Sequence, residues 1–318
     1  MGRHPIASVK KAGKKEITRV PKHEMLCTLT YSVKELVPFI NWLYFFYAWQ
    51  IPSQLTRCIV NQESQGGETD GKLLAQLSEG RRIYEDAMRF IGEFDKRYTV
   101  SCRIGLFEAQ SEEDDIFIYN NGKTICLPCL RQQHVVSTGT PNLCLSDYIA
   151  PIDSGMKDRI GAFAATVTAE MEQTGADDPY LHLIAQTVCD RLAEAATEKA
   201  HLKVRKEIWG YAPDEQLTTE ELFQEKFRGI RPAVGYPSLP DQSVNFILDE
   251  LIDMASLGIA ITENGAMSPH ASVSGFMFAH PQAKYFSVGK IGEDQLEDYS
   301  QRRGLPLDRM KQYLSANI

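Results

Sequence analysis

A proline-rich run of ten residues, Arg231 to Pro240, restricts the possible fold of this chain more than any other segment. Its three prolines fix three φ angles and remove three backbone donors, which excludes a helix or a central strand. Gly235 allows a backbone angle or a close approach that a side chain would block. The run is therefore predicted to be a stiff, extended loop. Taken by itself, such a segment is typical of a loop with a structural role over the core. It nevertheless carries ligand-binding groups, since Arg231 can bind a carboxylate through two parallel hydrogen bonds and Tyr236 offers a flat face with a polar tip.

The other predicted elements are hairpins and long helices that come in clusters. Residues 71–97 have apolar side chains at three-to-four-residue spacing, which predicts an amphipathic helix. Residues 101–107 and 159–168 are predicted strands, and Asn120-Asn121-Gly122 between two apolar runs is typical of a hairpin turn. Helices are expected from about Pro179 to Trp209 with Asp178 as the cap, after Thr218, and from Asp241 to Gly258. Short strands are expected near 259–263, 272–279 and 284–290, and one or two short helices at the end of the chain. Because strands and helices do not alternate strictly, the sequence predicts an α+β fold with a largely antiparallel sheet.

Charge is distributed unevenly along the chain. The formal net charge is −8, yet residues 1–22 contain seven Lys or Arg and one acidic residue. Residues 23–318 therefore carry 27 basic and 41 acidic residues, a formal charge near −14. A body this acidic is a poor partner for a nucleic-acid backbone. We expect residues 1–24 to form a basic, disordered leader, or alternatively an arm that docks on an acidic partner, and residues 25–318 to form the domain.

The sequence indicates no membrane segment. The basic leader lacks the apolar run of a signal peptide, and residues 36–51, although apolar and aromatic, are too few to span a bilayer. The seven cysteines are an odd number spread over a long chain, which is typical of reduced thiols. We therefore expect a cytoplasmic protein.

Motifs for side-chain chemistry are weak. Cys126 and Cys129 form a Cys-x-x-Cys motif, but it ends a predicted strand rather than starting a helix, where the dipole would lower a thiol pKa. No second pair and no suitably spaced histidines complete a zinc site, so no metal is expected. The chain also lacks a Gly-x-Ser-x-Gly motif and a glycine-rich phosphate loop after a strand. The sequence thus favours structural thiols and predicts no side-chain nucleophile.

Several longer motifs occur between about residue 30 and the C-terminus. They are Asn41-Trp42-x-x-Phe45-Phe46-x-x-Trp49, Leu130-Arg-Gln-Gln133, Cys144-Leu-x-Asp147, Ile160-Gly-Ala-Phe163, Trp209-Gly-Tyr-Ala-Pro213, Gly229-Ile-Arg-Pro-Ala-x-Gly-Tyr-Pro237, Ala271-Ser-Val-Ser-Gly275, Phe278, His280-Pro281 and Lys284-Tyr285-Phe286. In this order they closely resemble the activation, S-adenosylmethionine-binding domain of cobalamin-dependent methionine synthase.

The resemblance implies a single C-shaped domain with a bent, largely antiparallel sheet and flanking long helices. It also implies a repair function. When the cobalamin of the synthase is oxidised to cob(II)alamin, such a domain presents S-adenosylmethionine, and with one electron from a flavodoxin-type donor methylcobalamin is regenerated. The cobalamin would be held by a partner, so this chain would be a component of a methyltransferase and not catalytic alone. Cobalt would be the nucleophile, which accounts for the missing side-chain nucleophile.

The same resemblance assigns ligand-binding residues in the proline-rich loop. Arg231 would bind the ligand carboxylate, and the backbone of Ala233 and Val234 would meet the adenosine. Gly235 belongs to the same binding run. Tyr236 would face the corrin ring during reactivation.

Residues outside the loop complete the implied site. Tyr285 and Phe286 occupy a matching ligand-contacting pair. Glu194 and Glu225 lie where the family has carboxylates near the cleft, and either would favour a cationic ligand. Asn41 stands where the family has an aspartate that contacts the ligand. An amide still accepts and donates hydrogen bonds but contributes no charge, so selectivity for a cation would be weaker or would rest on Glu225.

Other signatures of the whole synthase are missing from this sequence. We find no Asp-x-His-x-x-Gly cobalamin loop, no cysteine set for a homocysteine-binding zinc and no barrel-length folate region. We therefore expect a stand-alone activation chain that works in trans on a cobalamin-binding partner. Two other classes stay open. One is a non-catalytic module that senses S-adenosylmethionine or docks to another corrinoid protein, and the other is a thiol oxidoreductase that uses Cys126 and Cys129.

Overall fold

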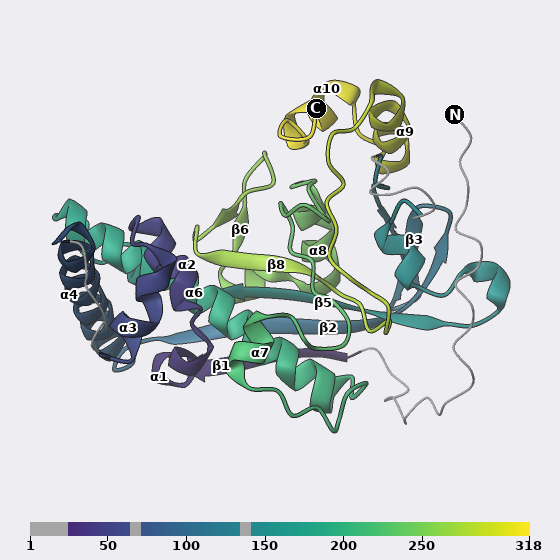
Figure 1. Cartoon of the computed structure of the whole chain (residues 1–318). Helices are drawn as coiled ribbons and strands as arrows, with labels where there is room; N and C mark the ends of the chain where they lie inside the picture. Colours follow the sequence, from purple (N-terminus) through teal and green to yellow (C-terminus); the bar gives the residue numbers. More distant parts are fainter. Residues whose placement is uncertain (1–24, 64–70, 134–140) are drawn as a thin grey trace.

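The structure is a computed structural model that describes residues 25–63, 71–133 and 141–318. The predicted basic leader, residues 1–24, lies outside the described residues. Figure 1 shows helices clustered around one extended sheet whose strand pairings are antiparallel, so the predicted α+β class is confirmed.

The main sheet contains six strands in the described part of the chain. They are β1 (Met25–Ser32), β2 (Thr99–Glu112), β3 (Asp115–Asn120), β4 (Lys123–Pro128), β5 (Asp158–Thr166) and β8 (Ser272–Met277). β2 is long enough to pair with β1 along its first part and with β3 along its last part, while β5 pairs along the opposite edge. β8 follows β5 at the end of the order β4-β3-β2-β5-β8. A separate two-stranded sheet consists of β6 (Ala260–Ile261) and β7 (Met267–Ser268).

The described part of the chain contains ten α-helices, some of which begin at a side-chain N-cap. Their bounds are α1 (Val33–Leu36), α2 (Trp42–Ala48), α3 (Thr56–Val60), α4 (Gly71–Phe94), α5 (Ala169–Glu172), α6 (Pro179–Lys203), α7 (Thr219–Phe223), α8 (Val244–Ile252), α9 (Glu293–Arg303) and α10 (Leu307–Tyr313). The predicted cap of α6 is confirmed, since the Asp178 side chain accepts from the backbone N–H groups of Tyr180 and Leu181. A π-helical turn, Val204–Ile208, continues α6. The capping box at Thr218 begins α7, as predicted.

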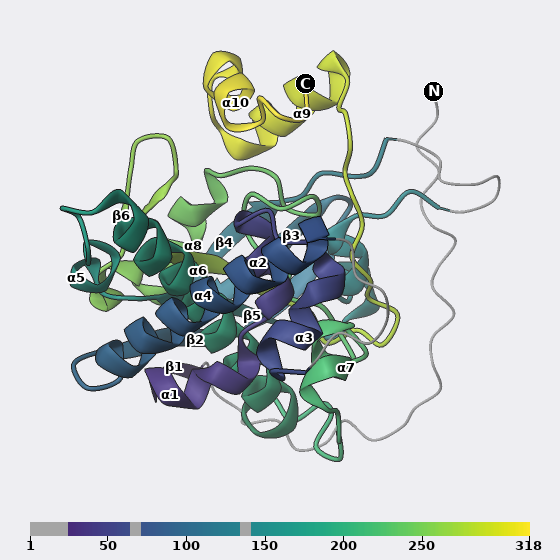
Figure 2. The same cartoon turned by 60° about the vertical axis from the view of Figure 1, so that its left-hand side comes forward.

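The two faces of the main sheet belong to different hydrophobic clusters because side chains alternate along each strand. Ile104 and Phe163 belong to the cluster that contains the buried side of α6, and Figure 2 brings α2, α4 and α6 to the front. Phe107 and Ala162 belong to the second cluster, which contains the buried side of α8. The sheet is therefore covered by helices on both faces.

The predicted hairpin joins β3 and β4. Asn121 and Gly122 have φ angles of 48° and 78°, as a tight primed turn requires. The end of α8 differs from the prediction, because Asp253 adopts a φ of 51° and ends the helix after Ile252. Gly258 instead ends the following 3₁₀ turn, Met254–Leu257.

The strand expected at residues 284–290 is not formed. Backbone groups of this segment bind the proline-rich loop irregularly. The Ser238 hydroxyl donates to the Phe286 carbonyl and accepts from the Phe286 N–H, and Val288 donates to Pro237 O at 2.9 Å. These bonds to a loop side chain and to a proline carbonyl take the place of a strand ladder.

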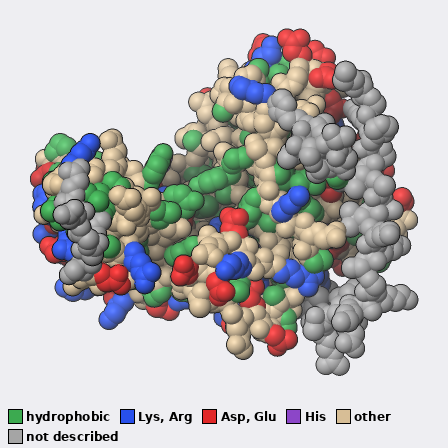
Figure 3. All heavy atoms as spheres, in the orientation of Figure 1, with side chains coloured by type: hydrophobic (Ala, Val, Ile, Leu, Met, Phe, Trp, Pro, Cys, Tyr) green, Lys and Arg blue, Asp and Glu red, His purple; other side chains and the backbone are tan. Residues whose placement is uncertain are grey.

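The surface is hollowed on the side shown in Figure 3, between the end that carries α2 and α4 and the part that carries β6. Hydrophobic side chains line much of this hollow. Among the described residues, no helix has both the length and the apolar character needed to cross a membrane.

Candidate functional site

The proline-rich loop lies along the outer edge of β8. Ile230 and Phe278 exchange two backbone hydrogen bonds, with N···O distances of 3.0 and 2.9 Å, and Val234 donates to Ser274 O at 2.9 Å. Pro232 has no N–H to donate in this ladder, which is tolerated at a sheet edge. The extended conformation expected for the loop is thus found, and the edge of β8 holds it in place.

The contact between loop and strand requires glycine at position 275. A Cβ on Gly275 would lie 2.8 Å from Ala233 Cα. Gly235 has a φ of 85°, which confirms the special backbone angle expected there. Because the Val234 N–H is bound to β8, it is not free for a ligand. The Ala233 N–H points away from β8, and the Ala233 carbonyl accepts from the Tyr236 N–H at 3.3 Å.

Arg231 forms an ion pair that was not foreseen from the sequence. Its Nη2 atom lies 2.5 Å from Glu198 Oε2, and the Glu198 side chain is 7% exposed. The backbone N–H of Arg231 donates to Tyr285 Oη at 3.0 Å. Burial disfavours the guanidinium charge, but Glu198 and Tyr285 more than offset it, so the pKa of Arg231 is raised. Arg231 therefore stays charged, and its side chain is partly exposed to an incoming anion.

Three other predicted residues lie around this ion pair. Tyr236 Oη donates to Glu194 Oε1 at 3.4 Å, and the charge of Glu194 contributes to the raised pKa of Arg231. Burial raises the pKa of Glu225, while the charge of Arg231 opposes this rise and that of Glu198 adds to it. The structure thus brings Arg231, Glu194, Glu225 and Tyr236 together, and we call them, with Glu198, the Arg231 cluster.

A buried polar stripe on α6 continues from Glu198. His201 and Arg205 are fully buried, and Arg205 Nη1 lies 2.8 Å from His201 Nδ1. Glu215 accepts from Arg205 Nε and Nη2 at 2.7–3.0 Å, which neutralises its charge. Burial and then the nearby arginines lower the pKa of His201 well below its ordinary value. The neutral ring accepts from Arg205 at Nδ1, so its Nε2–H donates to Tyr211 Oη at 3.3 Å.

The sequence contained a signal for this stripe. Glu194, Glu198, His201 and Arg205 follow one another at intervals of three or four residues, which places them on one face of a helix. Charged residues at this spacing usually form a solvated face, so the pattern alone did not distinguish the stripe from a surface. The tertiary structure makes the distinction, because residues 211–227 cover His201 and Arg205 and the proline-rich loop covers Glu198.

Two predicted site residues have structural partners. Asn41 is the N-cap of α2, and its Oδ1 accepts from the Leu43 N–H at 3.2 Å. An aspartate would make the same bond, so the cap does not depend on which of the two is present. Phe286 is 9% exposed and belongs to the hydrophobic cluster of α8. Of the predicted pair, Tyr285 is the residue whose side chain contacts Arg231.

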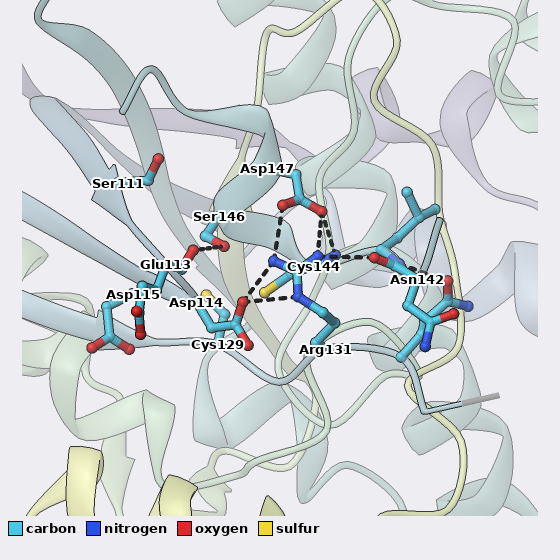
Figure 4. Close-up of polar contacts among 12 residues, drawn as sticks. Ser111, Glu113, Asp114, Asp115, Cys129, Arg131, Asn142, Cys144, Ser146 and Asp147 are labelled. Atoms are coloured by element: carbon cyan, nitrogen blue, oxygen red, sulfur yellow. Dashed lines mark hydrogen bonds and ion pairs between the residues drawn. The ribbon is translucent and has the colours of Figure 1, made fainter. Parts of the chain in front are cut away.

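A second charged network lies at the β3–β4 hairpin. Figure 4 shows Arg131 between Asp114 and Asp147, to which it donates at 2.6–2.9 Å. Asp147 also accepts from the Cys144 N–H at 2.8 Å. The network joins the β2–β3 turn to the segment that follows β4, and all its members are bound to one another, which is typical of a structural role.

The Cys-x-x-Cys thiols lie next to this network. A hydrogen bond with Cys144, together with burial, raises the pKa of Cys129 well above its ordinary value. Burial raises the pKa of Cys126 to about 11. Both thiols therefore stay protonated near neutral pH, which favours the structural interpretation over a redox pair. Within the part of the chain that the structure describes, no group of three His, Cys, Asp or Glu side chains could hold a metal ion.

An edge loop that holds an arginine among carboxylates is suited to bind a small charged ligand at the rim of a sheet. Comparison with known proteins specifies the family. The chain matches the family described as vitamin B12 dependent methionine synthase, activation domain, over residues 32–304. It is also similar to the crystal structure of the MetH reactivation domain bound to AdoHcy, with a TM-score of 0.80, 34% sequence identity, and coverage of 95% of this chain and 91% of that chain. The chain therefore belongs to the family of vitamin B12-dependent methionine synthase activation domains, and the resemblance seen in the sequence is confirmed.

Proposed function

We propose that this chain binds S-adenosylmethionine at the Arg231 cluster and presents the methyl group to reduced cobalamin on a partner, which returns an oxidised methionine synthase to its methylated form. The observation that carries the proposal is a charged arginine, with a side chain that is 21% exposed, held among carboxylates at the edge of β8. Family membership implies a partner that holds the cobalamin. The related MetH domain is bound to AdoHcy, the product that S-adenosylmethionine leaves after methyl transfer.

The Arg231 cluster fits the amino-acid end of this ligand, which carries a carboxylate, an ammonium and a sulfonium. Arg231 Nε and Glu198 Oε1 are buried and have no hydrogen-bond partner among the described residues, so the pair is not saturated. A ligand carboxylate beside Arg231 would add charge-assisted bonds. Cationic groups of the ligand would lie favourably near Glu194 and Glu225.

The residues of this chain would act by orientation rather than by chemical attack. The ligand supplies a methyl group already activated by the sulfonium. Arg231 and the backbone of Ala233 would hold the ligand along the edge of β8. Tyr236 is 53% exposed in the middle of the same loop, where it would face the corrin ring of the partner.

An exposed apolar surface on α2 supports docking of a partner protein. Leu43, Tyr44 and Tyr47 expose 41%, 57% and 80% of their surface. Exposed aromatic side chains that lie close together are typical of interaction sites. We propose that residues 25–318 form the activation domain, that the cobalamin-carrying partner docks here, and that a flavodoxin-type protein supplies the electron. A non-catalytic sensor of S-adenosylmethionine would need no such surface.

Calorimetric titration with S-adenosylmethionine tests the binding step. Arg231→Ala should lower the binding free energy by at least about 2 kcal/mol, because a charge-assisted contact is lost. Arg231→Lys should not restore binding, since an ammonium lacks the planar fork of a guanidinium. Arg57→Ala, which removes an arginine that is 82% exposed, serves as the control and should bind like the unchanged protein. Equal affinities for all four proteins would contradict the assignment of Arg231.

Remethylation of cobalamin tests the function as a whole. The protein is mixed with an oxidised, cobalamin-loaded synthase, a one-electron donor and S-adenosylmethionine, and methylcobalamin is followed by its absorbance. We expect methylcobalamin to form only when this chain is present. Binding of S-adenosylmethionine without formation of methylcobalamin would identify a sensing module instead.

A further inference from the structure

Glu198 is the most deeply buried countercharge of Arg231. Its side chain is 7% exposed, whereas that of Glu194 is 34% exposed and Glu225 lies on the surface. Water screens the charges of exposed carboxylates more than those of buried ones. The dominant electrostatic partner of Arg231 is therefore a residue that was not foreseen from the sequence.

The geometry of the pair assigns one edge of the guanidinium to Glu198. A guanidinium presents five N–H donors on two edges that can each bind a carboxylate. Glu198 Oε2 accepts from Nη2, while Arg231 Nε and Glu198 Oε1 are both buried without a partner among the described residues. Since these two atoms belong to the same ion pair, a bidentate contact would satisfy both. With Glu198 on the Nε–Nη2 edge, the edge formed by the two Nη atoms would remain for a ligand.

The position of Glu198 is fixed by α6. It lies in the interior of this helix, Pro179–Lys203, one turn before His201. His201 and Arg205 are fully buried and bound to each other, and Glu215 neutralises Arg205. A buried network in which every member has a partner is rigid. Glu198 is therefore held on a fixed support, unlike a carboxylate on a loop.

We propose that Glu198 is the positioning residue of the S-adenosylmethionine site: it holds the inner edge of the Arg231 guanidinium so that the outer edge faces the ligand carboxylate. This inference rests on the proposed function. Glu198 acts through Arg231 and does not touch the ligand. Its removal should therefore affect only ligands that carry a carboxylate.

Two probes separate this role from a merely structural one. S-adenosylmethionine carries the carboxylate, and decarboxylated S-adenosylmethionine lacks it but keeps the sulfonium and the amine. In calorimetry, Glu198→Ala should weaken binding of the first probe at least about tenfold, or about 1.4 kcal/mol, and of the second less than about threefold. In an Arg231→Ala background, Glu198→Ala should cause no further loss specific to the carboxylate.

Three further variants control for charge and folding. Glu198→Gln keeps an oxygen that can accept from Arg231 and should retain most of the preference for the carboxylate probe. Glu207→Ala removes an exposed ion pair with Lys203 next to α6 and should change neither affinity. Thermal unfolding verifies that each variant is folded. If Glu198→Ala does not fold, Glu198→Asp, which keeps the charge but shortens the reach, takes its place with the same expected preference loss.

Each other outcome overturns the inference. Equal losses for both probes would show a structural role for Glu198. Unchanged or tighter binding of S-adenosylmethionine by Glu198→Ala would show that Glu198 competes with the ligand or has no influence. If the unchanged protein prefers the carboxylate probe and the variants do not differ from it, the proposed function stands and the role of Glu198 is wrong. If the unchanged protein binds neither probe, the proposed function fails, and the inference fails with it.

Discussion

At the scale of single residues, charge is buried near α6 only where a partner of opposite sign is present. Arg205 is fully buried against Glu215, and Arg231 is largely buried against Glu198. Breaking such a pair by removing one member leaves an uncompensated charge and is strongly destabilising. The arginine that we propose as the ligand-binding residue therefore has its own countercharge within the fold.

His201 should make the free energy of unfolding depend on pH. In the folded protein its pKa is held well below the ordinary 6.5 by burial and by the nearby arginines. Between this lowered pKa and 6.5, the unfolded chain therefore binds a proton at His201 that the folded chain does not. The contribution of His201 is full above the unfolded pKa and is lost as pH falls, by up to about 1.4 kcal/mol per pH unit.

The His201→Gln variant isolates this effect, because a glutamine can still accept from Arg205 but does not titrate. Chemical unfolding of both proteins at several pH values between about 5 and 8 gives the measurement. We expect the stability difference between them to shrink as the pH is lowered. His280, whose pKa is also lowered by burial, is present in both proteins and cancels. Parallel stability curves would contradict the assignment.

At the scale of elements, the proline-rich loop covers the edge of β8. An uncovered edge presents unpaired backbone groups to other chains. Here the loop pairs with those groups through Ile230, Pro232 and Val234. The prolines that exclude a helix keep this segment extended, so that it can lie along the edge of β8.

Gly275→Ala should displace the loop from β8. The added methyl group would overlap the backbone of the loop, with Ala233 Cα 2.8 Å away. Overpacking of this kind costs about 1–3 kcal/mol of stability. Because the loop carries Arg231, the affinity for S-adenosylmethionine should fall as well, which calorimetry and thermal unfolding would show together.

Gly92→Ala is the matched control for this substitution. A Cβ on Gly92 would meet no atom within 4 Å, and the residue lies inside α4. This exchange should stabilise the protein by about 0.5–1 kcal/mol and leave ligand affinity unchanged. A Gly275→Ala protein that behaves like the control would refute the close contact.

At the scale of the whole molecule, buried ionic contacts attach the C-terminal helix α9 to the rest of the domain. Asp241, which is 1% exposed, accepts from Tyr299 at 2.9 Å and from Arg303 at 3.2 Å. Next to Arg303 in the chain, Arg302 has its Nη1 atom 2.5 Å from Oδ1 of Asp115 at the start of β3. The helix thus connects the segment before α8 with the β3–β4 hairpin.

Asp241→Ala should weaken the whole domain rather than α9 alone. It leaves the Arg303 side chain, 8% exposed, without its countercharge, for which a loss of about 3–5 kcal/mol is typical. Denaturant unfolding measures the change. Glu297→Ala, an exposed position on the same helix, should stay within about 0.5 kcal/mol of the unchanged protein. A small effect of Asp241→Ala would show that α9 is only loosely attached.

The elements that were predictable are those determined by nearby residues. The hairpin follows from Asn121 and Gly122, and α6 begins at its predicted cap, Asp178. Residues 284–290 were wrongly expected to form a strand, because their backbone groups bind Ser238 and Pro237, which are about fifty residues away in the chain. Local composition contains no information about such partners.

The sequence by itself determined the α+β class, the family and the stiff loop with Arg231, since periodicity, turn residues and proline act over a few positions. Only the tertiary structure decided that Glu198, His201 and Arg205 are core residues and that the Val234 N–H is bound to β8. The physical reason is that a charged side chain is buried, or a backbone donor satisfied, by whatever surface the fold brings against it. That surface comes from segments far apart in the chain, here α6, β8 and the loop that lies between them.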